Sequence, residues 1–206
     1  MLLADIGNTH FHIYDGQSVE HLTHGDAFVE YRNKPLYYVT VKYELEEKFG
    51  MVKKWHNISD LMKIEGEYAT MGVDRKALCL SHQNGLFVDA GSAITVDVME
   101  DGKYQGGFIL PGLKAMLKTY AGVSPVLDTV LNKEVSLDAL PLTTKDGISY
   151  GIIASIKTVI EKHQKSKKIY FTGGDGKFLS SLFEGSVFDE TLVFQGMMHA
   201  LRASEK

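Results

Sequence analysis

Two short glycine-containing segments carry the residue types that bind a polyphosphate. The first reads DIGNT at 5–9 and the second reads DAGSAIT at 89–95. Glycine lets the backbone come close to a ligand, and consecutive N–H groups can then cradle phosphate oxygens. An aspartate at a strand end, such as Asp5, suits Mg²⁺ held through one or two carboxylates and nucleotide phosphates. Either segment alone is equally well explained as a tight turn, so their co-occurrence is what favours phosphate binding.

A third glycine segment, TGGDG at 172–176, follows an expected strand and precedes an expected helix. Backbone atoms in that position often hold part of a nucleotide. The alternative is that these glycines only turn a strand into a helix. The chain contains neither a GxGxxG fingerprint nor a Walker GxxxxGK[ST] sequence, which excludes the P-loop kinases.

The segment GVDR at 72–75 has two interpretations. In the first, Asp74 caps the helix-compatible stretch 76–80 and Arg75 is a solvated residue of the first turn. In the second, Asp74 accepts a proton from an attacking hydroxyl while Arg75 fixes an acidic substrate by a bidentate contact. The residues alone favour the first interpretation.

Four histidines near the first glycine segment also need an explanation. They are His10, His12, His21 and His24. His10 and His12 are spaced to share one face of a strand, and with His21 and His24 they could bind zinc. No thiol or carboxylate accompanies them in a zinc-binding pattern, so a solvated strand face is the favoured interpretation.

Composition limits the class of protein. The 206 residues have a mass of 22.9 kDa and are 44% hydrophobic, enough for one large or two small globular domains. The net charge of −4 gives no general attraction to nucleic acid or to anionic membranes. Cys79 is the single cysteine, which excludes an internal disulfide and a cysteine-rich zinc site. Without a recognisable signal peptide or membrane span, we expect a soluble, cytoplasmic protein.

Hydrophobic periodicity predicts the elements that position these segments. Strands are expected over 2–6, 10–14, 18–23, 36–41, 86–89, 94–99, 104–110 and 167–171, with a short one near Leu192. Helices are expected over 42–49, 111–120, 177–183 and 195–202. A longer helix, capped by Thr143 or Thr144, carries an apolar stripe of Ile148, Ile152, Ile156, Val159 and Ile160. This order of elements is typical of a mixed α/β protein.

An internal repeat indicates two similar halves. The pattern of DIGNT and its returning strand recurs 84 residues later as DAGSA and another alternating strand. We therefore expect an N-terminal half over 1–84 and a C-terminal half over 85–206, each presenting one turn to a shared cleft. The last helix is a candidate to pack back on the first half.

The motifs together resemble the type III pantothenate kinases, members of the actin-like ATPase superfamily. The resemblance runs in order through six segments: DIGNT at 5–9, GVDR at 72–75, DAGSAIT at 89–95, GGFILPG at 106–112, TKDGISYG at 144–151 and TGG at 172–174. It implies a duplicated actin-like, ribonuclease H-like α/β fold with two mixed-sheet halves around a nucleotide cleft. The implied reaction is ATP-dependent phosphorylation of pantothenate to 4′-phosphopantothenate, the first step of coenzyme A biosynthesis.

The resemblance also implies roles for residues. ATP would be bound by Asp5, Gly7, Asn8, Thr9, Gly91, Ser92, Ala93, Gly173 and Gly174. Asp5 would hold Mg²⁺ through phosphate, and Asp89 would ligate a monovalent cation, K⁺ or NH₄⁺. Pantothenate would contact Tyr68, Gly72, Asp74, Arg75 and Thr144. Asp74 would be the catalytic base, and Thr144 would reach the substrate across a homodimer interface.

This sequence departs from the family pattern in the second loop, where the usual GTATT reads GSAIT. Ser92 keeps a hydroxyl, whereas Ile94 removes one. The chain is also short around 68–72 and 75–89, which affects the placement of Tyr68. Two other functions stand beside the first. A kinase for another small hydroxyl substrate would share the phosphate loops and differ in the GVDR region. A nucleotide-binding regulatory or accessory protein of the same fold is the second, because members of the family have also been described as transcription accessory factors.

Overall fold

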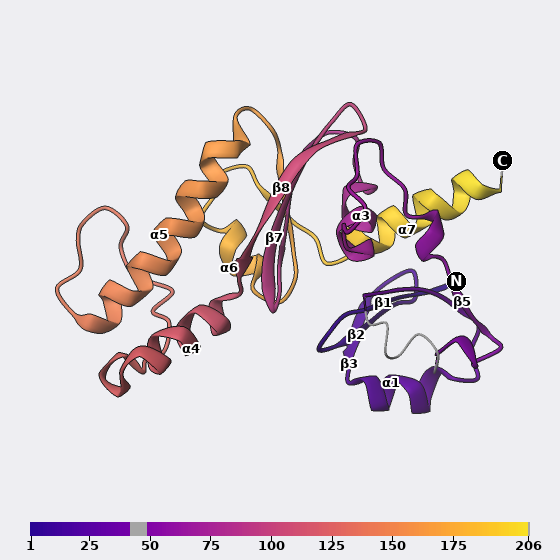
Figure 1. Cartoon of the computed structure of the whole chain (residues 1–206), viewed down its shortest axis with the longest axis horizontal. Coiled ribbons are helices and arrows are strands. Elements are labelled where there is room, and N and C mark those ends of the chain that lie inside the picture. The colour runs from indigo at the N-terminus through magenta and orange to yellow at the C-terminus, as the bar shows by residue number, and fades with distance from the viewer. Residues whose placement is uncertain (42–48, 206) are drawn as a thin grey trace. The chain divides into compact units, whose positions relative to one another are not determined.

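The computed structural model describes residues 1–41 and 49–205 (Figure 1). The helix predicted over 42–49 falls almost wholly on residues outside those ranges. The described chain forms two compact units. Unit 1 comprises Met1–Asn84, Asp97–Gly106 and Asp189–Lys206, and unit 2 comprises Gly85–Val96 and Gly107–Phe188. Each unit is described below by itself.

The first sheet has five strands in the order β3-β2-β1-β4-β5. β1 (Leu2–Ile6) pairs antiparallel with β2 (Phe11–Tyr14) and parallel with β4 (Leu36–Thr40). β3 (Val19–Leu22) and β5 (Trp55–Asn57) form the two edges. The strands predicted over 2–6, 10–14, 18–23 and 36–41 are therefore confirmed to within a residue or two.

An aromatic core fills one face of this sheet. Phe11, Tyr38, Phe49 and Trp55 are all at most 5% exposed, and Phe11 and Phe49 meet edge to face at 5.9 Å between ring centroids. A helix that the sequence interpretation missed, α1 (His24–Tyr31), lies along this core (Figure 1). Its N-cap is Thr23, whose hydroxyl oxygen accepts the Asp26 N–H, and this satisfies a helix-terminal donor.

Two packed helices complete unit 1. α3 (Val73–Cys79) and α7 (Leu192–Ser204) lie side by side (Figure 1). A Cβ added at Gly196 would lie 1.7 Å from the Ala77 carbonyl oxygen, so only glycine allows the two backbones to come this close. The helix predicted over 195–202 is confirmed within α7, whereas the strand predicted near Leu192 is wrong because that residue begins the helix. A 3₁₀ turn, η1 (Ser59–Leu61), lies before α3 in the chain.

The second sheet has the order β10-β9-β6-β7-β8. Its strands are β6 (Gly85–Ala90), β7 (Ala93–Glu100), β8 (Lys103–Pro111), β9 (Ile169–Thr172) and β10 (Val187–Phe188). Numbered from its own first strand, this sheet repeats the strand order of the first. The predicted duplication is therefore confirmed at the level of topology. β7 and β8 contribute residues 97–106 to unit 1 and their remaining residues to unit 2.

The helices of unit 2 follow the expected pattern. α4 (Leu113–Val123) begins after Gly112, and α5 (Thr144–Gln164) has Thr143 as its N-cap, with the hydroxyl accepting the Asp146 N–H. The predicted stripe on α5 is buried at its four isoleucines and half-buried at Val159. η2 (Pro125–Leu127) follows α4, and α6 (Gly176–Ser180) begins earlier and is shorter than the predicted 177–183. Over the described residues, every helix is too short or too polar to cross a bilayer.

Candidate active site

The first glycine turn is closed by its own backbone and held by a histidine. Asp5 lies in β1 one residue before the strand ends, and the Gly7 N–H donates to the His10 carbonyl at 3.0 Å. The carbonyl of Gly7 accepts a hydrogen bond of 3.0 Å from His24 Nε2, on the first residue of α1. Asn8 and Thr9 are exposed. The turn is thus a fixed loop with two polar side chains facing solvent, as a phosphate-binding loop requires.

The second glycine turn is packed against the start of α4. The Gly91 N–H donates to the Ala93 carbonyl at 2.9 Å, and Ser92 and Ala93 are exposed. The Gly112 N–H donates to the Ser92 carbonyl at 3.1 Å. A Cβ at Gly112 would lie 2.4 Å from the Gly91 carbonyl oxygen, so a larger residue would push the helix away from the turn.

The third glycine turn lies directly against the second. β9 runs parallel to β6 with Thr172 opposite Asp89, which brings both strand ends to one edge of the sheet. Gly173 has φ +86°, and a Cβ there would lie 2.4 Å from Asp89 Oδ1. The Asp175 N–H also donates to the Ala90 carbonyl at 2.9 Å. The structure therefore brings together the predicted ATP-binding residues of unit 2.

One polar atom beside the second turn has no hydrogen-bond partner among the described residues. It is Thr95 Oγ1, which is buried in β7. An unpartnered buried hydroxyl costs free energy unless water or a ligand satisfies it. The pattern GTATT has threonines at both positions that correspond to Ile94 and Thr95, and in this chain only the hydroxyl of Thr95 is kept.

Asp74 is not the cap of its helix. The N-cap of α3 is Gly72, which makes no side-chain cap bond, and Asp74 lies in the first turn. Its Oδ1 accepts the Arg75 N–H at 2.8 Å. Desolvation by the surrounding protein raises the pKa of the Asp74 carboxyl above its usual range, although the N–H and charge of Arg75 oppose the shift. A carboxylate with a raised pKa is a better proton acceptor at neutral pH than an ordinary one.

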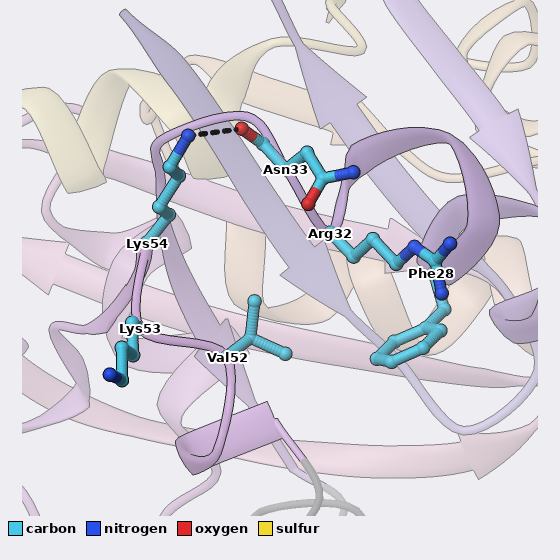
Figure 2. Close-up of a pocket in the computed structure, with 6 residues that line it drawn as sticks. All are labelled: Phe28, Arg32, Asn33, Val52, Lys53 and Lys54. Carbon is cyan, nitrogen blue, oxygen red and sulfur yellow. Dashed lines mark hydrogen bonds between the residues drawn. The ribbon is translucent and has the colours of Figure 1, made fainter.

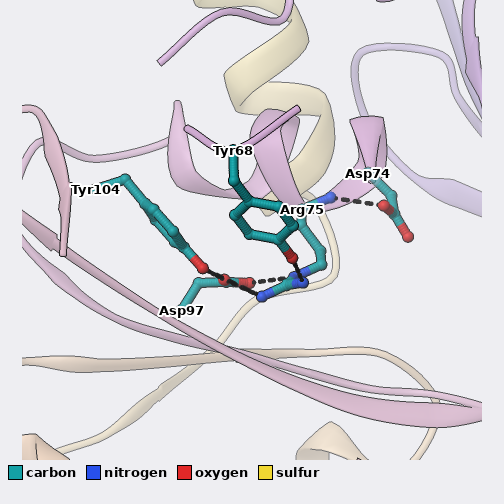
Figure 3. A network of polar contacts seen from close by, with 5 residues as sticks. All are labelled: Tyr68, Asp74, Arg75, Asp97 and Tyr104. Carbon is teal, nitrogen blue, oxygen red and sulfur yellow. Dashed lines mark hydrogen bonds and ion pairs between the residues drawn. The ribbon is translucent and has the colours of Figure 1, made fainter. Parts of the chain in front are cut away.

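Arg75 is buried, so the prediction that it is a solvated residue is wrong. Its side chain is 6% exposed, and Asp97, at 0%, binds it with both carboxylate oxygens (Figure 3). Nε donates to Oδ2 at 3.0 Å and Nη2 donates to Oδ1 at 2.6 Å. Burial alone would lower the pKa of the guanidinium, but the hydrogen bonds and charge of Asp97 outweigh it and raise that pKa.

Two tyrosines complete this cluster. Arg75 Nη1 donates to the Tyr68 hydroxyl at 2.5 Å, and Nη2 also donates to the Tyr104 hydroxyl at 3.3 Å. Tyr104 in turn donates to Asp97 Oδ1 at 3.0 Å. Tyr68 is 42% exposed whereas Tyr104 is 8% exposed, so Tyr68 is the member of the cluster that faces solvent.

Sequence reasoning did not identify Asp97 or Tyr104. The available signal was a carboxylate inside a strand at a position whose neighbours are apolar, in the order Val96-Asp97-Val98. A charged residue that a strand buries must be paired. Arg75 lies 22 residues earlier, and only the fold identifies it as the partner.

Thr144 is the first residue of α5 and is exposed in unit 2. Several apolar side chains of the same unit are exposed as well. They are Ile109, Val123, Val126, Val130, Leu140 and Leu142, with exposures from 58% to 100%. A run of exposed apolar residues of this kind marks an interaction surface.

The four histidines form a close group, but no three metal-ligating side chains are arranged around a common point in the described ranges. His12 Nδ1 and His21 Nδ1 are 2.6 Å apart. Burial, together with the charges of the neighbouring histidines, lowers the pKa of His12 to about 4. His10 and His21 are exposed as predicted, whereas His12 is half-buried.

Two cavities in unit 1 contain none of the predicted site residues. One, of about 310 Å³, has the basic side chains of Arg32, Lys53 and Lys54 around Phe28 and Val52 (Figure 2). Lys54 Nζ donates to the Asn33 carbonyl there at 2.9 Å. The other, of about 640 Å³, lies among the ends of α3 and α7 and the β7–β8 turn.

Comparison with known proteins gives a consistent result. A family model described as type III pantothenate kinase matches residues 40–165. The type III pantothenate kinase of Helicobacter hepaticus is 41% identical over 203 residues, which are 98% of this chain and 98% of that protein. A crystal structure of a conserved putative Baf family transcriptional activator from Campylobacter jejuni has a TM-score of 0.91 at 37% identity, covering 100% of this chain and 99% of its own.

A more distant structure supports the fold alone. A putative 2-dehydro-3-deoxygalactonokinase from Sinorhizobium meliloti has a TM-score of 0.59 at 9% identity, covering 98% of both chains. With the repeated strand order of the two sheets, this likeness confirms the predicted duplicated actin-like α/β fold.

Proposed function

This chain belongs to the type III pantothenate kinase family, and we propose that it transfers the γ-phosphoryl group of ATP to the primary hydroxyl of pantothenate. The products are 4′-phosphopantothenate and ADP, and the reaction is the first step of coenzyme A biosynthesis. The observation that carries the proposal is the relation to a curated kinase along 98% of the chain. The glycine turns and the half-buried Asp74 supply the chemistry that such a transfer needs.

The glycine turns are the proposed ATP-binding elements. In unit 1, Asp5, Gly7, Asn8 and Thr9 bind phosphate. In unit 2, Gly91, Ser92 and Ala93 bind phosphate, and Gly173 and Gly174 bind the nucleotide through their backbones. The fit rests on close backbone packing, because a Cβ at Gly112 or Gly173 would collide with the second turn.

Two cations are proposed to accompany ATP. Asp5 would hold Mg²⁺ through water and phosphate, because Mg²⁺ usually keeps several waters and is bound through one or two carboxylates and substrate phosphates. Asp89 would ligate K⁺ or NH₄⁺, since one of its carboxylate oxygens faces the glycine of the third turn. Such cations neutralise charge on the transferred phosphoryl oxygens.

Asp74 is the proposed general base. Its carboxylate takes the proton of the pantothenate hydroxyl as the oxygen of that hydroxyl bonds to the γ-phosphorus and the bond to the β-phosphate oxygen breaks. The raised pKa of Asp74 suits this step, and such bases typically contribute about 10² to 10⁴ in rate.

Tyr68, Gly72, Arg75 and Thr144 are the proposed substrate contacts. Gly72 lies against the base, since a Cβ there would be 2.4 Å from Asp74 Oδ1. The Arg75 fork is already held by Asp97, so the expected bidentate grip on an acidic substrate requires another donor. Tyr68 is an exposed residue, and its hydroxyl contacts Arg75 Nη1.

A homodimer is the proposed assembly. Leu142 is 100% exposed and lies two residues before Thr144, within the apolar surface of unit 2. Covering that surface with a second copy would bring Thr144 to a neighbouring chain. The cytoplasmic location expected from the sequence stays a prediction.

A coupled assay of ADP release tests the function. ATP and pantothenate are supplied with K⁺, with NH₄⁺ or with Na⁺ only. We expect turnover that depends on pantothenate and on K⁺ or NH₄⁺. Turnover with another hydroxyl substrate but not pantothenate would favour a different small-molecule kinase.

One specific observation favours a second candidate function. The Campylobacter jejuni relative of known structure carries the description of a putative transcriptional activator. A folded sample that binds ATP yet turns over no substrate under any cation would make this chain a nucleotide-binding regulatory protein.

A further inference from the structure

The buried pair of Arg75 and Asp97 is unusual in its cost and its position. Asp97 has no exposed surface, and Arg75 is 6% exposed. Removing two charges from water is expensive, and apolar residues of similar volume are often as stable or more stable in the same place. A pair of this kind, adjacent in sequence to the proposed base, therefore needs a reason other than stability.

The hydrogen bonds suggest that reason. A guanidinium has five N–H donors, and four are used by Asp97, Tyr104 and Tyr68. The fork that normally grips a carboxylate is occupied by Asp97. The member of the cluster that remains exposed is Tyr68, whose hydroxyl oxygen accepts from Arg75.

This contact fixes the direction of the tyrosine proton. Since a guanidinium cannot accept a hydrogen bond, the Tyr68 O–H must donate elsewhere. The Arg75 charge, 5.8 Å from the Tyr68 ring centroid, also polarises that hydroxyl. The Tyr68 hydroxyl thus keeps its proton for an acceptor other than Arg75, such as an oxygen of a bound substrate.

We propose that Asp97 is a positioning residue, which locks the Arg75 guanidinium so that it orients the Tyr68 hydroxyl toward the substrate. Tyr104 assists by donating to Asp97 and accepting from Arg75. Figure 3 shows the chain of contacts, with the Asp74 carboxylate directed away from it. The inference rests on the proposed function, because the substrate in question is pantothenate.

Steady-state kinetics of Asp97→Asn give the first test. We expect the KM for pantothenate to rise about tenfold or more, as for loss of an orienting charged hydrogen bond, while the KM for ATP stays within about twofold. Asp60→Asn, an exposed aspartate of η1, is the matched control and should change neither value. An equal rise in both KM values would indicate general damage and overturn the proposal.

A double-mutant cycle tests whether Asp97 acts through Tyr68. If it does, Asp97→Asn combined with Tyr68→Phe raises the pantothenate KM no more than the stronger single change. Multiplication of the two effects would mean independent roles and would contradict the inference. Tyr104→Phe keeps the ion pair and should raise the same KM less than Asp97→Asn does.

A measurement without substrate separates this inference from the proposed function. The chain has three arginines, and Arg32 and Arg202 are exposed, so ¹⁵N NMR should show one slowly exchanging Arg Nε–H, that of Arg75. Asp97→Asn should abolish its protection, and Asp60→Asn should not. If this holds but pantothenate is not turned over, the proposed function alone fails.

If the Asp97→Asn variant does not fold, two other measurements still decide the question. They are the Arg75 signal of the unaltered chain and the kinetics of Tyr104→Phe. Rapid exchange of Arg75 in the unaltered chain would overturn the proposal, as would an unchanged pantothenate KM in Tyr104→Phe.

Discussion

At the scale of single residues, Asp74 and Arg75 are chain neighbours with opposite environments. Arg75 is neutralised by a buried counter-charge, whereas Asp74 is desolvated and its Oδ1 accepts a backbone N–H rather than a charged side chain. The protein therefore stabilises one charge and destabilises the other. A destabilised carboxylate is the feature expected of a proton acceptor.

Asp74→Asn should fold, bind ATP and lose most phosphoryl transfer. The amide retains the shape and the acceptor for the Arg75 N–H but cannot take a proton, so kcat should fall by about 10² to 10⁴. Single-turnover kinetics and ATP titration measure the two properties separately. An unchanged rate would assign Asp74 a purely structural role in the first turn of α3.

The pH profile should report the raised pKa of Asp74. A general base works only when deprotonated, so kcat/KM for pantothenate should rise with pH through the pKa of Asp74. Because burial raises that pKa, the acid limb should lie above the ordinary aspartate value of about 3.9. Circular dichroism at each pH would show that the fold persists. A limb at the ordinary value would mean that Asp74 is solvated in the working enzyme.

The sequence alone allowed some residues of this site to be predicted, but not all of them. The glycine turns and GVDR could be found because each is a contiguous pattern. Asp97 and Tyr104 could not, since their roles depend on the Arg75 guanidinium, which only the folded chain brings to them. The sequence interpretation of Arg75 as solvated failed for the same reason.

At the scale of elements, local capping and tertiary packing compete. Thr143 caps α5 as predicted, but Thr23, in the similar order Thr-x-x-Asp, was overlooked and α1 with it. The run Leu192-Val193-Phe194 has the composition of a strand. It is helical because α7 buries those side chains and packs on α3, so tertiary contacts override β propensity.

The α3–α7 contact should be highly sensitive to one methyl group. Gly196→Ala would place a Cβ against the Ala77 carbonyl oxygen, which is backbone and cannot rotate away. We expect a loss of about 1 to 3 kcal/mol in the free energy of unfolding, measured in urea. Gly122→Ala in α4 is the matched control, since nothing lies within 4 Å of its added Cβ. It should be neutral or stabilising by up to about 1 kcal/mol.

At the scale of the whole molecule, the repeat in the sequence proved to be a repeat of topology. The segments DIGNT and DAGSA predicted two sheets with the same strand order, because each lies in the first hairpin of its sheet. The strands β5 and β10 have only three and two residues, too few for an alternating hydrophobic pattern to be recognised, so they were not predicted. The membership of residues 97–106 in unit 1 is likewise a property of packing, which a linear pattern does not encode, whereas the last helix was a candidate for the first half from the sequence.

The proposed dimer makes a prediction about assembly. Leu142→Asp should weaken self-association by placing a charge on the exposed apolar surface of unit 2, as measured by sedimentation velocity across protein concentration. Val29→Asp is the matched control, because Val29 is 72% exposed on α1. It should leave the association constant unchanged. A monomer at all concentrations in the unaltered chain would refute the dimer itself.

Subunit complementation should then locate Thr144. Suppose that Asp74→Asn and Thr144→Ala are each nearly inactive. If Thr144 serves the site of the partner chain, a mixed dimer holds one site with both residues intact and one with neither. Refolding an equal mixture should therefore restore about a quarter of the unaltered activity, since half of the dimers are mixed and half of their sites are intact. If both residues serve a site of their own chain, every site in the mixture lacks one of them and no activity returns.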